Sequence, residues 1–194
     1  MEFNLVFFLN SALLGVGLAM DAFSVSLANG LGEPHMKKGR MCGIAGVFGI
    51  FQALMPIIGW ICVHTAAEHF TSFEKLIPWI ALILLLYIGE KMLIDGIKGG
   101  EEHEKVKLTF QTLMLQGIAT SIDALSVGFT ISEYSAETAL LCALIIASVT
   151  FVICFCGLII GKKFGTKLAG KASVLGGIIL IVIGLEIFIS GLLK

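Results

Sequence analysis

Charged residues are scarce in this sequence: they make up 14% of its 194 residues, whereas hydrophobic residues make up 57%. A typical soluble domain carries about 25% charged residues. The mean hydropathy is +1.00, and a single small core cannot bury that much apolar surface. The composition therefore excludes a soluble enzyme, a disordered chain and a small disulfide-stapled domain. It predicts a protein that crosses a lipid bilayer several times.

Further features of the sequence exclude other kinds of protein. The net charge is −1, so no basic field is present to hold nucleic acid. No G-x-x-x-x-G-K-[ST] motif occurs, which excludes a P-loop ATP site. The five cysteines lie in or beside apolar runs, and we interpret them as buried hydrophobic residues, not as ligands or disulfides. No Lys or Arg precedes the first apolar run, so we expect the first helix to be retained and not cleaved as a signal peptide.

Six apolar stretches are long enough to cross a bilayer, which takes about 20 residues of helix. They cover residues 3–28, 42–65, 76–94, 108–131, 138–161 and 173–193. Because the connections are short, residues 1–194 are predicted to form one all-α transmembrane domain. Eleven of the thirteen Lys and Arg residues lie at the end of the first, third or fifth stretch or in the connection that follows it. The positive-inside rule then places those connections in the cytoplasm and both termini outside.

The two halves of the chain resemble each other. A shift of 102 positions lays Gly15 to Leu27 on Gly117 to Phe129, with five of the thirteen residues identical. A shift of 98 positions sets Gln52 opposite Thr150. Repeats of this kind, 3–98 and 108–193, would each hold three helices, and an odd number inverts the second copy in the membrane. Inverted repeats are a recurring transporter architecture, with the binding site near mid-membrane at the repeat interface.

Asp21 and Asp123 occupy equivalent positions in the repeats, and both lie well inside a predicted span. A carboxylate at the centre of a spanning helix costs about 2.5–3.5 kcal/mol on insertion scales. Neither span contains a Lys or Arg that would neutralise its aspartate. Two such carboxylates are therefore expected to face a protein-lined cavity and to bind a cation, a proton or both.

Further oxygen donors accompany the aspartates. Ser24 and Ser126 lie three residues beyond them and Thr120 lies three residues before Asp123, which places these hydroxyls on the faces of the carboxylates. Ser26 and Asn29 are less well aligned, and they would join the site through a kink or an unwound segment. Oxygen donors suit a hard divalent cation such as Mn²⁺, Mg²⁺ or Ca²⁺.

The second span adds Gln52, four residues before Pro56. Proline has no N–H, so the carbonyl of Gln52 loses its usual helical partner. Gln52 would then offer a side-chain oxygen and a backbone carbonyl to the same site. A plain helix kink at Pro56 is the alternative interpretation.

The residues around these positions resemble the bacterial manganese efflux pump (MntP) family. The likeness rests on Met20-Asp-Ala-Phe-Ser-Val-Ser26, Phe51-Gln-Ala-Leu-Met-Pro-Ile-Ile-Gly-Trp60 and Ser121-Ile-Asp-Ala-Leu-Ser-Val-Gly128. This resemblance implies Mn²⁺ export across the plasma (inner) membrane within the lysine-exporter-like superfamily, and Asp21 and Asp123 match the family's intramembrane acids. Some members carry Glu where this chain has Gln52, which would change the charge of the site.

The resulting hypothesis is a multi-pass secondary transporter and not an enzyme. Mn²⁺ is its substrate, proton antiport drives it, and no resident cofactor is expected. Another divalent cation or a small cationic metabolite is the alternative cargo, and a homodimer is left open. An intramembrane aspartyl protease also uses two membrane aspartates. Its Gly-x-Gly-Asp motif is absent here, because the corresponding stretches read Leu18-Ala-Met-Asp21 and Thr120-Ser-Ile-Asp123.

Overall fold

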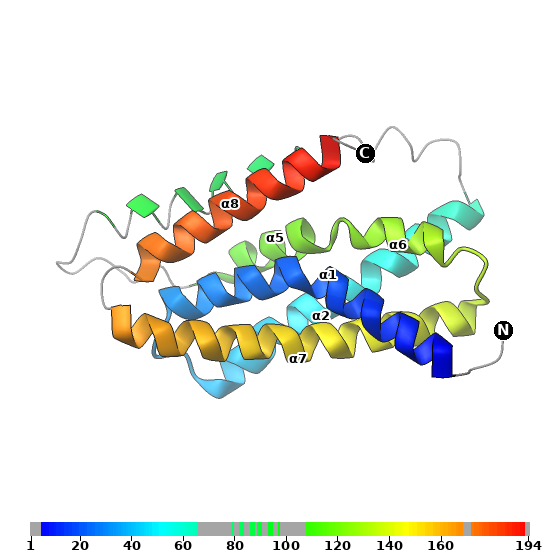
Figure 1. The fold of residues 1–194 in the computed structure, drawn as a ribbon, viewed down its shortest axis with the longest axis horizontal. Helices are drawn as coiled ribbons and strands as arrows, with labels where there is room; N and C mark the ends of the chain where they lie inside the picture. The colour runs from blue at the N-terminus through cyan, green and yellow to red at the C-terminus, as the bar shows by residue number, and fades with distance from the viewer. Residues whose placement is uncertain are drawn as a thin grey trace.

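Helices make up every regular element that the structure describes. The computed structural model describes residues 5–65, 79, 82–83, 86–87, 89–90, 93–94, 97, 108–168 and 172–192. The helices with defined bounds are α1 (Leu5–Gly32), α2 (Lys38–Thr65), α5 (Phe110–Ser121), α6 (Ala124–Thr130), α7 (Ala136–Leu168) and α8 (Ala172–Leu192) (Figure 1). The prediction of an all-α protein is therefore confirmed for the described part of the chain.

Three of these helices, α1, α2 and α7, are long and apolar enough to cross a membrane. They contain 28, 28 and 33 residues, which corresponds to about 42 to 50 Å of helix at a rise of 1.5 Å per residue. Large apolar side chains such as Leu5, Ile50 and Val152 are exposed on their outer surfaces. The hydrocarbon core of a bilayer is a favourable environment for such an apolar surface, whereas water is not.

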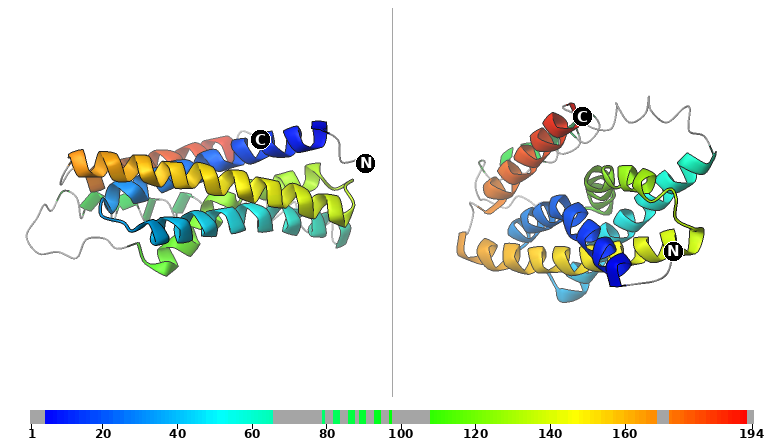
Figure 2. Two further views of the ribbon diagram at one scale, coloured as in Figure 1. Left: turned by 90° about the horizontal axis from the view of Figure 1, so that it is seen from below. Right: turned by 45° about the vertical axis from the view of Figure 1, so that its right-hand side comes forward.

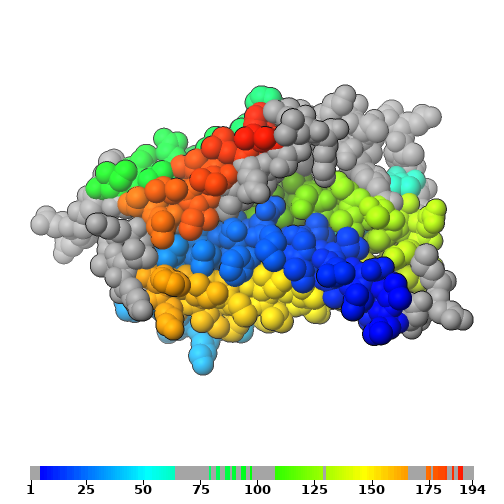
Figure 3. Space-filling view, viewed as in Figure 1, coloured from blue at the N-terminus to red at the C-terminus, as the bar shows by residue number. Residues whose placement is uncertain are grey.

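Helix α7 lies along one side of the bundle, where it packs against α1 and α2 (Figures 1 and 2). In addition, α2 packs against α6, and α1 packs against α8. The face in Figure 3 shows α7, α1 and α8 side by side. Glycine makes two of these contacts close. A Cβ atom on Gly30 of α1 would meet the backbone of α7 at Leu158, and one on Gly128 of α6 would meet the backbone of α2 at Pro56.

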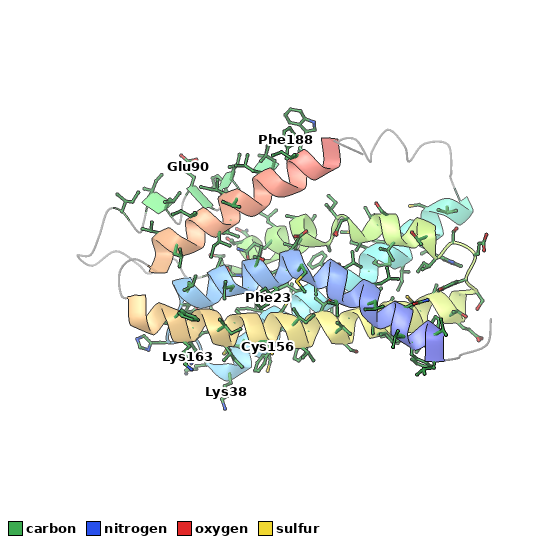
Figure 4. The ribbon with its side chains drawn as sticks, in the orientation of Figure 1. Phe23, Lys38, Glu90, Cys156, Lys163 and Phe188 are labelled. Atoms are coloured by element: carbon green, nitrogen blue, oxygen red, sulfur yellow. The ribbon has the colours of Figure 1, made fainter. Side chains whose placement is uncertain are left out.

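Basic side chains gather at one end of the bundle. Arg40, at the start of α2, donates a hydrogen bond of 2.8 Å to the carbonyl of Leu108, just before α5. Lys162, near the end of α7, donates one of 2.7 Å to the carbonyl of Met36. Lys38 projects from the same region (Figure 4). The connections that the sequence marks as basic after the first and fifth spans therefore meet, and we call this the basic end.

The fourth predicted span differs from expectation. Residues 108–131 were expected to form one helix, but the structure divides them into α5 and α6 with a break at Ile122 and Asp123. The first, second, fifth and sixth spans coincide with α1, α2, α7 and α8. The third span, 76–94, lies outside the described residues apart from isolated positions. The full count of six spans, the inverted repeat and the placement of the termini therefore stay predictions.

Candidate metal centre

A single glutamine joins the helix that carries Asp21 to the helix that precedes Asp123. The side chain of Gln52 is fully buried on α2. Its Nε2 donates hydrogen bonds of 2.8 Å to the carbonyl of Leu18 on α1 and 3.0 Å to the carbonyl of Thr120 on α5. Leu18 precedes Asp21 by three residues, and Thr120 precedes Asp123 by three residues. One amide group therefore holds two backbone positions that the shift of 102 makes equivalent.

This geometry fixes the orientation of the Gln52 amide. Carbonyl oxygens only accept hydrogen bonds, so the atom between Leu18 and Thr120 must be the nitrogen. The Oε1 atom then points the other way, where it is buried without a hydrogen-bond partner in the described residues. An unsatisfied buried acceptor costs about 1–3 kcal/mol, and such an atom requires an explanation. A bound cation would supply one.

The two aspartates stand one helical turn beyond these carbonyls, in different local structures. Asp21 is partly buried within the continuous helix α1, whereas Asp123 is exposed at the break between α5 and α6. Beyond the break, Ser126 N donates to the carbonyl of Asp123 at 3.0 Å and begins the first turn of α6. The break leaves the Thr120 carbonyl outside the regular ladder of an unbroken helix, and Gln52 donates to it.

Three hydroxyl groups that the sequence assigned to the site lie on the same elements as the aspartates. Ser24 Oγ donates to the carbonyl of Met20 at 3.1 Å, and Thr120 Oγ1 donates to the carbonyl of Gln116 at 2.9 Å. Ser126 is partly buried on α6. Each hydroxyl oxygen keeps lone pairs that can accept or coordinate while its proton is donated to the backbone.

Ser26 and Asn29 are directed elsewhere. Ser26 is fully buried, and its hydroxyl neighbours the thiol of Cys154 on α7. Asn29 forms a reciprocal amide pair with Gln116 of α5. Its Nδ2 donates to Gln116 Oε1 at 2.8 Å, and Gln116 Nε2 donates to Asn29 Oδ1 at 3.1 Å. Both polar groups of the Asn29 side chain are therefore occupied by Gln116.

Two members of this network were missing from the sequence-based site: the carbonyl of Leu18 and the side chain of Gln116. No sequence signal marks the Leu18 carbonyl, because the residue four positions later is Ala22 and not a proline. Gln116 did carry a signal, because it is a glutamine inside an apolar span, four residues before Thr120. Polar residues within a membrane span are expensive and face the protein interior.

An open pocket of about 550 Å³ lies between α1 and α6. Its residues belong to the half of α1 before Asp21 and to the chain after Asp123: Asn10, Leu13, Leu14, Gly17, Leu18, Val127, Thr130, Ile131 and Tyr134. At this end of the bundle, opposite the basic end, Trp60 Nε1 donates to the carbonyl of Tyr134 at 3.0 Å. The pocket thus reaches from this end to Leu18, one turn from Asp21.

Clusters of three or more His, Cys, Asp or Glu side chains do not occur in the described residues. A cation here would therefore depend on two carboxylates and neutral oxygen atoms. Such a donor set suits hard divalent ions and not soft ones.

The long apolar helices α1, α2 and α7 define a helical membrane protein. The family model described as "Mntp: Putative manganese efflux pump" matches residues 35–188. The chain belongs to this family, and the resemblance seen in the sequence is confirmed.

Curated relatives are similar over nearly their full length. A "Putative manganese efflux pump MntP" of Rippkaea orientalis is 44% identical over 95% of this chain and 97% of the relative. One from Clostridium botulinum (strain Hall), named "Putative manganese efflux pump MntP 2", is 44% identical over 92% of each. Another, from the archaeon Methanosarcina acetivorans, is 39% identical over 96% of this chain and 98% of the relative. No solved structure gives a significant match.

Proposed function

We propose that this protein exports Mn²⁺ from the cytoplasm through the plasma membrane, and that the ion binds between Asp21, Asp123 and the Oε1 atom of Gln52. One observation carries the assignment of the site. The Gln52 amide donates to carbonyls one turn before each aspartate, and its oxygen is left buried without a partner among the described residues. That oxygen is the acceptor which a cation would satisfy.

The chemistry of the donors supports a divalent metal. Two carboxylates balance the charge of one Mn²⁺ ion, and carboxylate, amide and hydroxyl oxygens are the ligands that hard divalent ions prefer. We propose that Ser24, Ser126 and Thr120 complete the ligand shell. Ser26 and Asn29 lie outside the proposed shell, because their side chains face Cys154 and Gln116.

The choice of manganese rests on the family. The relatives are named manganese efflux pumps, while an oxygen donor set alone does not separate Mn²⁺ from another divalent cation or a small cationic metabolite. We extend the cargo in those names to this chain. The sequence carries no P-loop, so we propose that an inward proton gradient drives the export.

Packing between the two halves supports alternating access by inverted repeats. A Cβ atom on Gly157 of α7 would meet the backbone of Phe23 on α1, and one on Gly59 of α2 would meet the backbone of Leu125 on α6. The shift of 102 equates Phe23 with Leu125, and the shift of 98 equates Gly59 with Gly157. In this arrangement each repeat packs its first helix on the second helix of the other, as rocking of two repeats about a central site requires.

Uptake of Mn²⁺ into inside-out vesicles tests the function directly. Wild-type protein and the Asp21→Asn and Asp123→Asn variants are compared with and without an acidic lumen. Glu137→Gln is the matched control, because it makes the same chemical change at an exposed position on the first turn of α7. We expect uptake by the wild type and the control only. Normal uptake by both aspartate variants would place the site elsewhere, and uptake of Ca²⁺, Cd²⁺ or lysine in place of Mn²⁺ would change the cargo.

A further inference from the structure

The amide pair of Asn29 and Gln116 closes the space between α1 and α5 toward the basic end. Both side chains are buried, with Asn29 6% and Gln116 0% exposed. The two reciprocal hydrogen bonds, of 2.8 and 3.1 Å, satisfy one donor and one acceptor on each residue. This pair therefore forms a polar contact between the first helices of the two repeats, between the proposed site and the basic end.

At the end of the bundle opposite the basic end, the positions equivalent to Asn29 and Gln116 are apolar and line a pocket. The shift of 102 equates Asn29 with Ile131 and Gln116 with Leu14. Leu14 and Ile131 both line the open pocket of about 550 Å³. At one end the equivalent positions meet in a hydrogen-bonded pair, and at the other end they belong to one apolar cluster that borders the open pocket.

Burial of the surrounding positions follows the same division. Four further pairs are equated by the shift: Val25 with Val127, Ala28 with Thr130, Gly17 with Ala119, and Leu18 with Thr120. All four members toward the basic end are buried, namely Val25, Ala28, Ala119 and Thr120. Of the members toward the pocket, only Leu18 is buried, while Gly17 and Thr130 are exposed and Val127 is partly buried.

A chain of hydrogen bonds connects the amide pair to the proposed metal centre. Thr120 Oγ1 donates to the backbone carbonyl of Gln116 at 2.9 Å, and the backbone carbonyl of Thr120 accepts from Gln52 Nε2 at 3.0 Å. Separation of Asn29 from Gln116 by a movement of α5 would therefore also displace a carbonyl that orients Gln52. The amide pair and the metal centre are coupled through the last turn of α5.

We infer that the structure is closed at the basic end and open at the opposite end, and that Asn29 and Gln116 form the inner gate of the transporter. This inference rests on the proposed function, and on the cytoplasmic placement of the basic end. In the opposite state the amide pair separates, and Leu14 and Ile131 close over the outer pocket as an apolar seal. The two gates are thus unequal, because one is a hydrogen-bonded lock and the other is a hydrophobic contact.

Thiol accessibility tests the gate without any metal. Gly17 and Ala119 are equivalent under the shift of 102, so cysteines at these two positions form a matched pair in a background that lacks the native cysteines. A Cβ atom on Gly17 would meet no atom within 4 Å, and Ala119→Cys adds one sulfur atom. A membrane-impermeant maleimide is applied to right-side-out and to inside-out vesicles. We expect Gly17→Cys to react from the outside and Ala119→Cys to be protected from both sides.

Removal of the Asn29–Gln116 hydrogen bonds should change this pattern of cysteine labelling. The double variant Asn29→Leu, Gln116→Leu removes both partners together, which leaves no unpaired amide and makes the two gates chemically alike. We expect labelling of Ala119→Cys from the inside to rise about tenfold, and labelling of Gly17→Cys from the outside to fall. Gln116→Asn keeps an amide but shortens it, and it should give a smaller change in the same direction. Gln111→Leu, on an exposed position of α5, should change neither rate.

Two results would overturn the inner gate. One is that, with Asn29 and Gln116 unchanged, Ala119→Cys is labelled from the inside as fast as Gly17→Cys is labelled from the outside. The other is unchanged labelling in both the double variant and Gln116→Asn. Because no Mn²⁺ is present, the expected pattern in a protein that fails to transport Mn²⁺ would uphold the gate and refute the proposed function alone.

Discussion

Asp21 and Asp123 occupy equivalent positions in the two halves of the chain, yet the backbone around them differs. The helix continues through Asp21 in α1, whereas it is interrupted at Asp123 between α5 and α6. The preceding turn supplies a physical reason. Thr120 Oγ1 and Ser121 Oγ donate back to the carbonyls of Gln116 and Gly117, at 2.9 and 2.6 Å. The equivalent residues of α1 are Leu18 and Ala19, which have no hydroxyl.

A single hydroxyl of this kind does not interrupt a helix here. Ser24 bonds back to Met20 within α1, and Ser148 bonds back to Leu144 within α7, and both helices continue. Back-bonding of Ser or Thr to the preceding turn weakens and bends helices. Two adjacent residues that both bond back, directly before Asp123, coincide with the break. Residues 110–130 therefore form a discontinuous helix, a feature that also occurs near the substrates of transporters.

The largest expected effect tests whether the two aspartates are equal partners. Loss of a metal-orienting residue outside the ligand shell commonly costs 10- to 100-fold in metal affinity or activity, so loss of a ligand should cost at least about a hundredfold. We expect Asp21→Asn and Asp123→Asn each to reduce Mn²⁺ uptake by this factor. Equal losses would mean that both halves contribute a ligand. A loss in Asp123→Asn alone would confine the site to the broken helix.

Gln52 joins the two halves, so its removal should have the next largest effect. Gln52→Leu deletes both hydrogen bonds to the Leu18 and Thr120 carbonyls and the Oε1 atom. We expect a loss of about 10- to 100-fold in Mn²⁺ uptake. Gln116→Leu is measured for comparison, since it removes an amide from the same buried network without removing a proposed ligand. Uptake by Gln52→Leu equal to that of the wild type would show that the orphaned oxygen has no role in binding.

Close backbone packing between the halves can be compared at equivalent glycines. A Cβ atom on Gly59 would contact both the Leu125 carbonyl and Gly128, more tightly than one on Gly157 would contact Phe23. Overpacking typically costs about 1–3 kcal/mol. We expect Gly59→Ala to lower the thermal unfolding temperature in detergent more than Gly157→Ala does. Gly43→Ala, where a Cβ atom meets nothing within 4 Å, should not lower it. If Gly157→Ala lowered the unfolding temperature more than Gly59→Ala, the contact between α1 and α7 would be the more tightly packed of the two.

The smallest expected effect concerns the break itself. The double variant Thr120→Leu, Ser121→Ala gives α5 the residues that α1 has before Asp21. It should strengthen the helix through Asp123 and slow amide hydrogen exchange at residues 122–125 by less than about tenfold, because back-bonding is a weak effect. Ser148→Ala removes a back-bonded hydroxyl in an unbroken helix and should not change exchange at 122–125. Faster exchange in the double variant would mean that the hydroxyls stabilise the break and do not cause it.

Sequence reasoning identified much of this molecule because the relevant signals are local. The span lengths follow from runs of apolar residues, and α1, α2, α7 and α8 lie where those runs predict. Gln52 is predicted because it lies four residues before Pro56, whose missing N–H frees the Gln52 carbonyl beside the side-chain oxygen. The family follows from short motifs around Asp21, Gln52 and Asp123, and the family model and the relatives confirm it.

Other features escaped sequence reasoning because they depend on which residues meet across the bundle. Asn29 is poorly aligned with Asp21 and was expected to reach the site through a kink or an unwound segment, but no local signal indicates Gln116, 87 residues away, which occupies its side chain. The fourth span was expected to be continuous, since hydropathy records apolar length and not the direction of a hydroxyl.

The residues alone predict a bundle of apolar helices with an aspartate inside each of two spans, because hydropathy and the cost of placing charge in lipid are properties of each residue. Helix packing, in contrast, sets one amide against the carbonyls before both aspartates and leaves its oxygen buried without a partner among the described residues. Hydrogen bonds of 2.8 and 3.0 Å from one side chain to two other helices depend on how the helices pack, which local sequence signals do not specify.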